Sequence, residues 1–510
     1  MPEYLAPGVF IEEIERGPKP IEGVATSTTA FLGETERGPT WPTLVTGYGD
    51  YLRLFGDVFT PGKYEPYAVK AFFDNGGRRA YIARIVGAGG AVATATIAGV
   101  TINAHGTGAA MNRTWVRIEQ GSTSKGGVAV GFRMRVFYWD RLPEGDDPFD
   151  PIAEDKKFPR PTITEDFDDL MLQEDSPNHW AKRVNNGNSS LVEIDIPAGT
   201  ALPAALAQGP LEDGEDGGPL IPADLEGDED ADADLRTGLA ALNLDPFRDI
   251  AIVAAPGQTD PAFLKPVIDH CERHRFRFAV IDGEQNQPQP AQLDPRTDID
   301  DSKYAALYYP WLIVSDPRTG ARVEVPPSGA VCGIYALTDN TRGVWKAPAN
   351  ETVAGALDVK YDVNTRAQEV LNPKGVNCIR RFPGRGIRVW GARTLSSDPL
   401  WKYVNVRRLF IFLEASIYFS TQWTVFEPND PKLWARVKQT VTLFLRSQWR
   451  EGALFGEKEE EAFQVAIGRD TMTEDDILNG RLIIEIGIAP VRPAEFVIFR
   501  VYQKTQEAKE

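Results

Sequence analysis

Residues 249–283 read DIAIVAAPGQTDPAFLKPVIDHCERHRFRFAVIDG, and this stretch decides the fold class. Its two ends, 249–256 and 277–283, are short apolar runs typical of strands that are buried on both faces of a sheet. Between them, residues 260–274 have helical character, with Asp260 as the N-cap and Pro261 at the first helical position. A strand, a helix and a strand of these lengths form a parallel βαβ unit. The sequence therefore predicts an α/β domain here.

The pattern of strands and helices continues on both sides of this stretch. Downstream, 304–317 (YAALYYPWLIVSDP) reads as one strand and 327–339 as a helix, and then come strands at 376–382 and 385–394. Two long helices follow, one at 404–426 and one beginning at Pro431 behind Asn429 or Asp430 as its cap, and strands lie at 462–468 and 481–490. Upstream, 24–86 is mixed α/β. Residues 91–200 show short alternating strands typical of a separate all-β domain, and 201–240 read as a loop or partly disordered lobe.

Length and composition exclude several classes of protein. A chain of 510 residues with 42% hydrophobic residues can form two to four packed domains. No apolar run reaches the roughly 18–20 residues that a membrane span needs, and the N-terminus lacks the pattern of a secretory signal. Three widely spaced cysteines, Cys271, Cys332 and Cys378, fit a reducing cytoplasm and neither a disulfide framework nor a zinc site.

Charge is distributed unevenly along the chain. The net charge of −18 argues against a general binder of nucleic acid or anionic membranes. Eleven acidic residues lie between Glu212 and Asp234, whereas residues 380–450 hold thirteen Lys or Arg against four acids, a net of +9. A basic stretch in an acidic protein suggests an acidic surface as partner. The alternative interpretation is that these charges are ordinary solvated helix faces.

Both ends of the chain carry a strand-like run that prolines separate from the body. Residues 8–14 (GVFIEEI) are rich in β-formers and precede GPKP, which cannot join a sheet ladder. Residues 494–502 (AEFVIFRVY) follow PVRP at 490–493 and precede the charged tail QKTQEAKE. Neither run has a tight hairpin turn that would fold it back on a neighbouring strand of its own chain. The pattern therefore predicts two terminal arms that pair elsewhere.

The sequence lacks the familiar motifs of catalytic sites. It contains no GxSxG elbow, no P-loop and no HExxH. In HCERH, His270 and His274 share a helix face at metal-ligand spacing, but no third ligand is evident, so surface or packing histidines are the favoured interpretation. The acidic run at 212–234 lacks the ordered spacing of a calcium loop. We predict no catalytic residue, no metal site and no cofactor.

Three segments together resemble contractile tail sheath proteins. These are the opening YLAPGVFIEEIERGPKPIEGVATSTTAFLGETERGP, the middle part from DPFRDIAIVAAPGQTD to YAALYYPWLIVSDP, and the run from GIRVWGARTLSSDP to LRSQWREGALFG. The resemblance covers about 1–86 and 245–505, and 88–244 does not carry it. In this family such a region is a variable insertion, usually displayed on the outside of the tube. The family includes phage tails, R-type bacteriocins, extracellular contractile injection systems and type VI secretion sheaths, and this single chain is most similar to phage tails and phage-like injection systems.

The resemblance implies a multidomain α/β and α+β protein. Its expected parts are an N-terminal linker arm (1–23), a core sheath domain built from 24–87 and 349–490, an inserted all-β outer domain with an acidic loop (88–244), a βαβ middle domain of subtilisin-like fold (245–348) and a C-terminal linker arm (491–510). Nothing in 245–345 supplies a Ser/His/Asp triad, so the expected protein is not an enzyme.

The resemblance also implies a function and partners. Sheath subunits stack as hexameric rings around an inner tube, and contraction drives the tube through a target envelope. The arms add strands to neighbouring subunits. The candidate arm residues are Val9, Phe10, Ile11, Glu12, Glu13 and Ile14, and Phe496, Val497, Ile498, Phe499, Arg500, Val501 and Tyr502. Extended at ~3.3 Å per residue, 8–22 spans about 50 Å, enough to reach an adjacent copy.

A helix of the C-terminal domain holds the tube by charge in this family, so Lys432, Arg436 and Lys438 are the candidate tube-facing residues. Expected partners are further copies of the chain, the inner tube protein, and baseplate and terminator or cap proteins, without nucleic acid or membrane. Assembly is expected in the bacterial cytoplasm, as part of a phage tail or tail-like particle. The alternatives are an α/β hydrolase without a recognisable triad and a soluble binding module that uses 91–200.

Overall fold

The computed structural model describes residues 20–57, 60–125, 128–142, 147–149, 159–185, 187–201 and 205–501. The chain divides into two compact units. The larger unit spans 25–408, and the smaller unit combines the residues up to Val24 with those from Leu409 onward. Helix α10 (Val404–Ser420) begins in the larger unit and ends in the smaller one.

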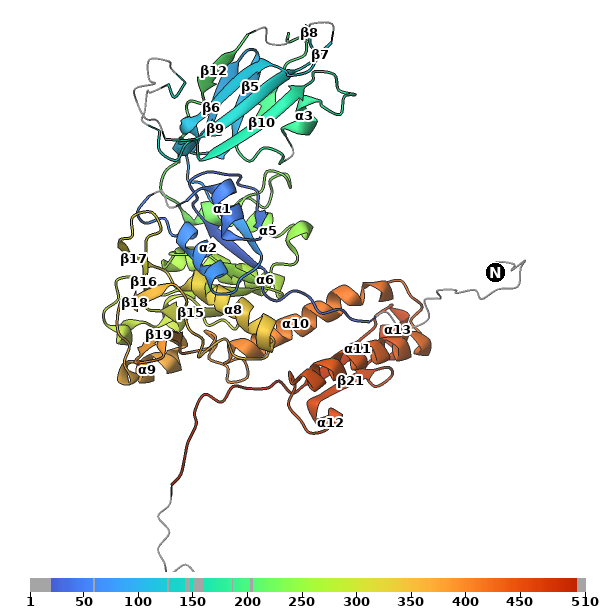
Figure 1. Cartoon of the computed structure of the whole chain (residues 1–510). Coiled ribbons are helices and arrows are strands. Elements are labelled where there is room, and N and C mark those ends of the chain that lie inside the picture. Colours follow the sequence, from blue (N-terminus) through green and yellow to red (C-terminus); the bar gives the residue numbers. More distant parts are fainter. Residues whose placement is uncertain are drawn as a thin grey trace, which may run out of the picture. The chain divides into compact units, whose positions relative to one another are not determined.

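An eight-stranded sheet lies within the larger unit, in the order β2-β3-β1-β13-β14-β15-β19-β20 (Figure 1). Its strands are β1 (Thr29–Gly33), β2 (Thr43–Val45), β3 (Ala80–Arg84), β13 (Ile252–Ala254), β14 (Phe278–Asp282), β15 (Ala305–Tyr309), β19 (Val376–Phe382) and β20 (Gly386–Val389). The six inner strands run parallel, and β2 and β20 pair antiparallel at the edges. Every residue of β1, β14 and β15 is buried, as expected for strands covered on both faces.

Helices pack against this sheet and against each other. Helices α2 and α8 contact one another, and both α6 and α8 contact β14. The helices of the larger unit, besides α10, are α1 (Tyr48–Phe55), α2 (Glu65–Asp74), α3 (Trp180–Arg183), α4 (Pro222–Glu226), α5 (Gly238–Leu242), α6 (Pro261–His274), α7 (Pro295–Asp298), α8 (Ser328–Arg342) and α9 (Thr365–Leu371). No helix of the described ranges is long and apolar enough to span a membrane.

The predicted βαβ unit is confirmed. Strands β13 and β14 are parallel neighbours, with Ile252 opposite Phe278, and α6 connects them. Asp260 caps α6, because its side chain accepts a hydrogen bond from the backbone N–H of Ala262 at 2.8 Å, and Pro261 is the first helical residue. The chain is therefore a mixed α/β protein, as the sequence predicts.

Two features of this sheet differ from the prediction. The sequence assigns 24–87 and 245–348 to different domains, whereas β1 of the first range pairs directly with β13 of the second. The single strand predicted over 304–317 is also wrong, because it divides at Pro310 into β15 and β16 (Leu312–Ser315). Strand β16 belongs to another sheet, with β17 (Arg322–Val325) and β18 (Ala356–Val359). Proline has no N–H to donate, so a ladder cannot continue through it.

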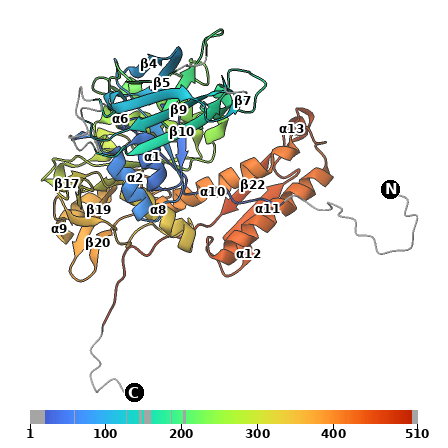
Figure 2. The ribbon, with the colours of Figure 1, turned by 45° about the horizontal axis from the view of Figure 1, so that its top comes forward.

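The strands between β3 and β13 pair only among themselves within the described ranges, in antiparallel sheets (Figure 2). One sheet has the order β10-β9-β6-β12, another has β11-β5-β4, and β7 pairs with β8. Buried residues from both larger sheets, including Ile102, Val116 and Val136, share one hydrophobic cluster. The bounds are β4 (Val92–Ile97), β5 (Val100–Thr107), β6 (Thr114–Gln120), β7 (Ser124–Lys125), β8 (Val128–Ala129), β9 (Phe132–Tyr138), β10 (Ile163–Leu170), β11 (Val192–Asp195) and β12 (Ala207–Pro210).

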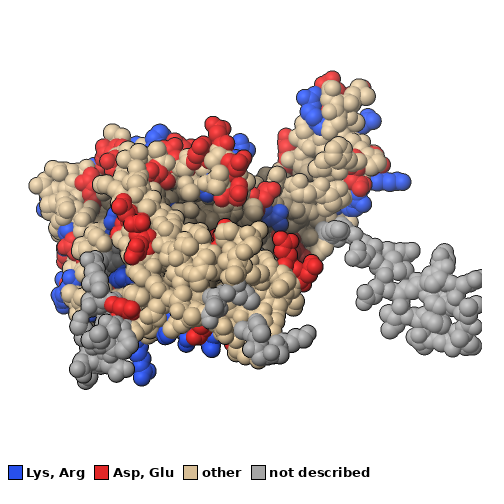
Figure 3. Space-filling model, turned by 90° about the horizontal axis from the view of Figure 1, so that it is seen from above, with Lys and Arg blue, Asp and Glu red and all other residues tan. Residues whose placement is uncertain are grey.

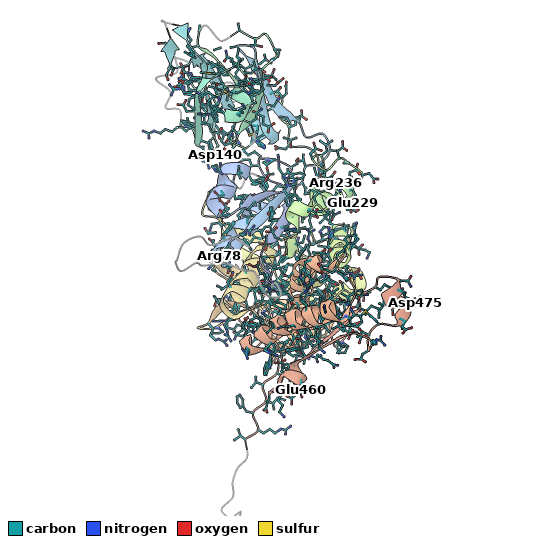
Figure 4. The ribbon with its side chains drawn as sticks, turned by 90° about the vertical axis from the view of Figure 1, so that its right-hand side faces the viewer. Arg78, Asp140, Glu229, Arg236, Glu460 and Asp475 are labelled. Carbon is teal, nitrogen blue, oxygen red and sulfur yellow. The ribbon has the colours of Figure 1, made fainter. Side chains whose placement is uncertain are left out.

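The acidic stretch is more ordered than predicted. Strand β12 and helix α4 lie within the 201–240 segment that the sequence assigns to a loop or partly disordered lobe, and helix α5 begins there at Gly238. The backbone of Glu212 exchanges two hydrogen bonds with Thr94, and the side chain of Glu229 accepts hydrogen bonds from Arg273 at 2.6 Å and Asn243 at 2.8 Å (Glu229 is labelled in Figure 4). Thr94 and Arg273 lie far from these acids in the sequence, which is why local composition does not reveal the contacts.

The smaller unit is built on helices α10 and α11 (Pro431–Glu451). It also contains α12 (Glu459–Ala462), α13 (Glu474–Leu478), β21 (Phe463–Ile467) and β22 (Ile484–Ile488), which agree with the predicted strands. Helix α10 ends at Ser420, six residues before the predicted end, and a 3-10 turn, Gln422–Thr424, follows it. Asp430 caps α11 by accepting from the backbone N–H groups of Lys432 and Leu433. The exposed acids Glu460 and Asp475 lie on α12 and α13 (Figure 4).

Candidate assembly interface

The C-terminal segment after β22 exposes a continuous run of large apolar side chains. Backbone hydrogen bonds hold the chain as far as the N–H of Val491, which donates to Ala453. Residues 492–501 have no regular secondary structure. Five apolar side chains there are between 68% and 93% exposed: Phe496, Val497, Ile498, Phe499 and Val501. Folded monomers rarely leave such a run in water, which makes this run a candidate contact surface.

The described residues 494–501 of the predicted strand are not assigned to any strand in the single chain. Tyr502 and the N-terminal arm residues Val9, Phe10, Ile11, Glu12, Glu13 and Ile14 lie outside the described residues. The inter-subunit role of both arms stays a prediction.

The sheet from which the C-terminal segment leaves is incomplete. Strands β21 and β22 form a two-stranded antiparallel pair, and no further strand of the described ranges joins either edge. Phe463 and Val465 on β21 are buried, whereas their cross-strand partners Ile488 and Ile486 on β22 remain half-buried. A two-stranded sheet is marginal by itself, and its open edges offer unpaired N–H and C=O groups.

Helix α11 covers one face of this sheet and presents the candidate basic residues on another side. Its buried residues recur at helical spacing, from Leu433 through Val437 and Val441 to Gln448, and β21 packs against the helix. Lys432, Arg436 and Lys438 are all exposed. Lys432 and Arg436 are four residues apart and share a face, whereas Lys438 lies about 120° away from Lys432 around the helix.

The three basic residues also differ in their partners. Arg436 donates to Glu427 at 3.0 Å, and its guanidinium lies 4.3 Å from the centroid of the Trp423 ring. Among the described residues, Lys432 and Lys438 have no ion-pair partner. Among these three candidate residues, the unbalanced positive charge therefore lies on the two lysines, a distinction that the sequence alone does not reveal.

The two histidines at metal-ligand spacing pack together within the larger unit. The rings of His270 and His274 are 4.6 Å apart, and Nε2 of His270 lies 2.6 Å from Nη1 of Arg277. Burial, with Arg277 next, lowers the pKa of His270 to about 2 and that of His274 to about 4. No group of three potential metal ligands occurs among the described residues. His270 is buried against Arg277, and Nε2 of the half-buried His274 lies 2.6 Å from Oδ1 of Asn243.

A buried carboxyl at the end of β14 is a polar site that the sequence analysis missed. Asp282 accepts three hydrogen bonds, from the backbone N–H of Gly257 at 3.1 Å and from the N–H and hydroxyl of Ser328 at 2.8 and 2.7 Å. Burial raises its pKa to about 6, and these hydrogen bonds oppose the rise. Among the described residues, no histidine joins this Asp–Ser pair as a general base. The hydrogen bonds of Asp282 instead connect the end of β14 to the first residue of α8.

On the face shown in Figure 3, Asp and Glu side chains form several groups among largely uncharged surface. The candidate features for assembly are apolar and lie near the C-terminal end of the chain, namely the exposed 496–501 run and the open two-stranded sheet.

Comparison with known proteins identifies what shares this architecture. The family models described as phage tail sheath protein central domain and phage tail sheath C-terminal domain match residues 231–395 and 396–504, together more than half of the chain. A putative prophage major tail sheath protein of Pseudomonas aeruginosa is 26% identical over 275 residues, which cover 52% of this chain and 69% of that protein.

Two solved structures match nearly the whole chain. A chain of the anti-feeding prophage helical sheath in its contracted state has a TM-score of 0.59 and 26% identity, over 98% of this chain and 99% of that chain. A chain of the six-fold symmetrised baseplate of the same particle has a TM-score of 0.56 and 25% identity, over 98% and 99%. The similarity thus extends through the 88–244 region as well.

Proposed function

Because this chain belongs to the phage tail sheath protein family, we propose that it polymerises as stacked hexameric rings around an inner tube and contracts to drive that tube through a target cell envelope. The structural neighbours support a sheath role, since one was solved in a contracted helical sheath and another in a six-fold symmetrised baseplate. The observation that carries the proposal for this chain is its exposed C-terminal run beside an incomplete sheet.

Strand exchange explains both halves of that observation. The run at 496–501 has strand-forming side chains without a partner, and β21–β22 has open edges without a further strand. Adding the arm of one copy to the sheet of another gives the arm a strand to pair with and gives the sheet a further strand. A ladder hydrogen bond contributes only about 0.5–1.5 kcal/mol net, so one arm is weak, and a lattice of many arms is hard to break.

The joints beside the arms suit a polymer that changes shape. Gly17, Pro18 and Pro20 precede the body at one end, and Pro490 and Pro493 follow it at the other. Glycine and proline disfavour regular structure, so these positions would let subunits reorient while the arms stay paired. The arms would thus keep rings connected during contraction.

Further parts of the chain receive roles under the same proposal. Lys432, Arg436 and Lys438 hold the acidic side of the inner tube in the extended state. The antiparallel sheets between β4 and β12 form the inserted outer domain, and the α/β part corresponds to the subtilisin-like middle domain of the family. The partners are further copies, the tube protein, the baseplate and a terminator or cap protein, and assembly takes place in the bacterial cytoplasm.

Electron microscopy of truncated chains tests the proposal. We expect that deletion of residues 1–20 leaves a folded subunit with an unchanged thermal midpoint that no longer forms tubes. The control removes residues 503–510, the part of the C-terminal arm that follows its candidate strand residues, and should assemble normally. Normal sheaths from the 1–20 deletion would show that the N-terminal arm is not a connector.

A further inference from the structure

The chain passes from one unit to the other at two places. The carboxylate of Asp339 forms hydrogen bonds with a residue beside each of these places, Thr26 and Arg408. The crossings lie at residues 24–25 and 408–409. Oδ2 of Asp339 accepts hydrogen bonds from Thr26 Oγ1 at 2.7 Å and from Arg408 Nη2 at 2.6 Å, and Oδ1 accepts from Arg408 Nη1 at 2.9 Å. Arg408 Nη2 also donates to the carbonyl of Thr26 at 2.8 Å. These three residues thus connect the N-terminal segment, α10 and α8 within the larger unit.

This cluster is sealed from solvent. The side chains of Asp339 and Arg408 are each 4% exposed, and the Arg408 guanidinium lies 4.7 Å from the centroid of the Tyr335 ring. Asp339 stands in the last turn of α8, where the helix dipole disfavours a negative charge. Its charge therefore does not stabilise α8 itself, and the acid is suited instead to holding the arginine and the threonine.

Within the smaller unit, hydrogen bonds at regular intervals connect the N-terminal segment to α10. The backbone N–H of Val24 donates to Ser416 Oγ at 3.1 Å, and that of Glu22 donates to Ser420 Oγ at 3.3 Å. Two residues of extended chain advance about 6.6 Å, and four residues of helix advance about 6 Å, so the two periods match. The N-terminal segment therefore runs antiparallel along α10 (Figure 1).

The start of α10 is itself embedded in the larger unit. Val404, Asn405 and Val406 are buried, and the Asn405 side chain donates to the carbonyl of Trp345 at 2.8 Å. The helix thus has anchors of its own, whereas the N-terminal segment depends on Asp339 and Arg408 for its side-chain and carbonyl contacts at Thr26.

We propose that Asp339 is the anchor that makes the N-terminal segment and helix α10 one mechanical element where they leave the larger unit. The anchoring follows from the contacts above. Its mechanical role rests on the proposed function: a pull on the N-terminal arm by a neighbouring copy reaches α10 through Ser416 and Ser420 and ends at Asp339. The pull is thus diverted from β1 and delivered to the helix that leads into α11.

Hydrogen exchange of the isolated full-length chain tests the anchor without any polymer. In Asp339→Asn, we expect the amides of 20–28 and of 404–412 to exchange at least about tenfold faster, because a buried arginine loses its charged partner. Peptides from β14 should not change. The control Asp269→Asn, which breaks an ion pair with Lys265 whose members are 46% and 55% exposed, should leave every peptide unchanged. Unchanged exchange in both segments, or an equal rise in the β14 peptides, would overturn the anchor.

Two further variants separate anchoring from general damage. Thr26→Val should accelerate exchange only in 20–28, because α10 keeps its ion pair. The double variant Asp339→Leu with Arg408→Met replaces the buried pair by apolar side chains, a change that often restores stability. It should return 404–412 to the wild-type rate, while 20–28 stays fast for lack of both partners of Thr26. Recovery of 20–28 in the double variant would contradict the proposal.

The mechanical role has its own test. If the exchange results hold, sheaths of Thr26→Val should assemble and then break between rings during contraction more often than wild-type sheaths in electron micrographs. Intact contraction together with faster exchange would remove the mechanical role and leave the anchor. A failure of all chains, wild type included, to form tubes would count against the proposed function and not against the anchor.

Discussion

The eight-stranded sheet of the larger unit and the two-stranded sheet of the smaller unit differ in how far their strands are paired and buried. The first has parallel inner strands buried on both faces, with an antiparallel strand at each edge. The second has two strands, half-buried isoleucines on β22 and a following apolar run in solvent. One sheet has all its strands within the chain, whereas the other has only two strands among the described residues and leaves its edges open.

Under the proposed function, this difference would let one chain be stable by itself and also join a polymer. Stability arises where burial is complete, because each buried large apolar side chain contributes about 1.5–3 kcal/mol. Under the proposed function, connection to other copies would use the region where burial is incomplete. Substitutions in the two sheets should therefore separate folding from assembly.

The largest expected contrast comes from the same substitution in each sheet. Ile252→Ala in β13 removes a fully buried side chain and should lower the free energy of unfolding by about 3–4 kcal/mol. Ile486→Ala in β22 removes a half-buried one and should cost about 1 kcal/mol or less in the monomer. Urea titrations measure both values. In tube assays the ranking should reverse, with Ile486→Ala the more defective among folded subunits, and equal assembly by both variants would break the comparison.

Much of this contrast is foreshadowed in the sequence. The βαβ unit, the Asp260 and Asp430 caps and the proline-bounded ends follow from local patterns. The pairing of β1 with β13 does not follow from local patterns, because more than 200 residues separate the strands. An apolar run does not indicate which other strand it pairs with. The Asp339–Arg408 pair is missed for the same reason, since the two residues are 69 positions apart. Neither helix has a sequence pattern that indicates contact with the other.

A smaller effect should appear with pH in the complete sheet. Asp282 has a folded-state pKa raised to about 6 by burial, above the ordinary 3.8. The fold therefore holds this proton more tightly than the unfolded chain, and the resulting stability is full below about pH 4 and is lost as the pH rises through about 6. Relative to Asp282→Asn, the wild type should gain about 1–2 kcal/mol between pH 7.5 and pH 5.

Denaturant titrations of both proteins at the two pH values measure this difference. Using the difference between wild type and variant cancels the contributions of His270 and His274, whose lowered pKa values act in the opposite direction. A difference that does not change with pH would mean that Asp282 is ionised throughout, held so by Ser328 and Gly257.

The smallest effect on folding, and the sharpest on partner choice, is expected on α11. Charge reversal of the exposed residues Lys432, Arg436 or Lys438 should change the free energy of unfolding by at most about 1 kcal/mol. Because Glu427 already balances Arg436, Lys432→Glu and Lys438→Glu should cause premature contraction of extended particles more often than Arg436→Glu does. Counting contracted particles by electron microscopy measures this.

The pair Glu427–Arg436 supplies the control for that comparison. Glu427→Gln leaves Arg436 without its acidic partner and raises the positive charge of this face, so it should make extended particles more resistant to contraction. If all the reversals at 432, 436 and 438 leave extended particles unaltered, α11 does not face the tube, and its lysines belong to a contact with a neighbouring subunit or to solvent. If Arg436→Glu alone triggers contraction, the contact depends on the guanidinium stacked on Trp423 and not on net charge.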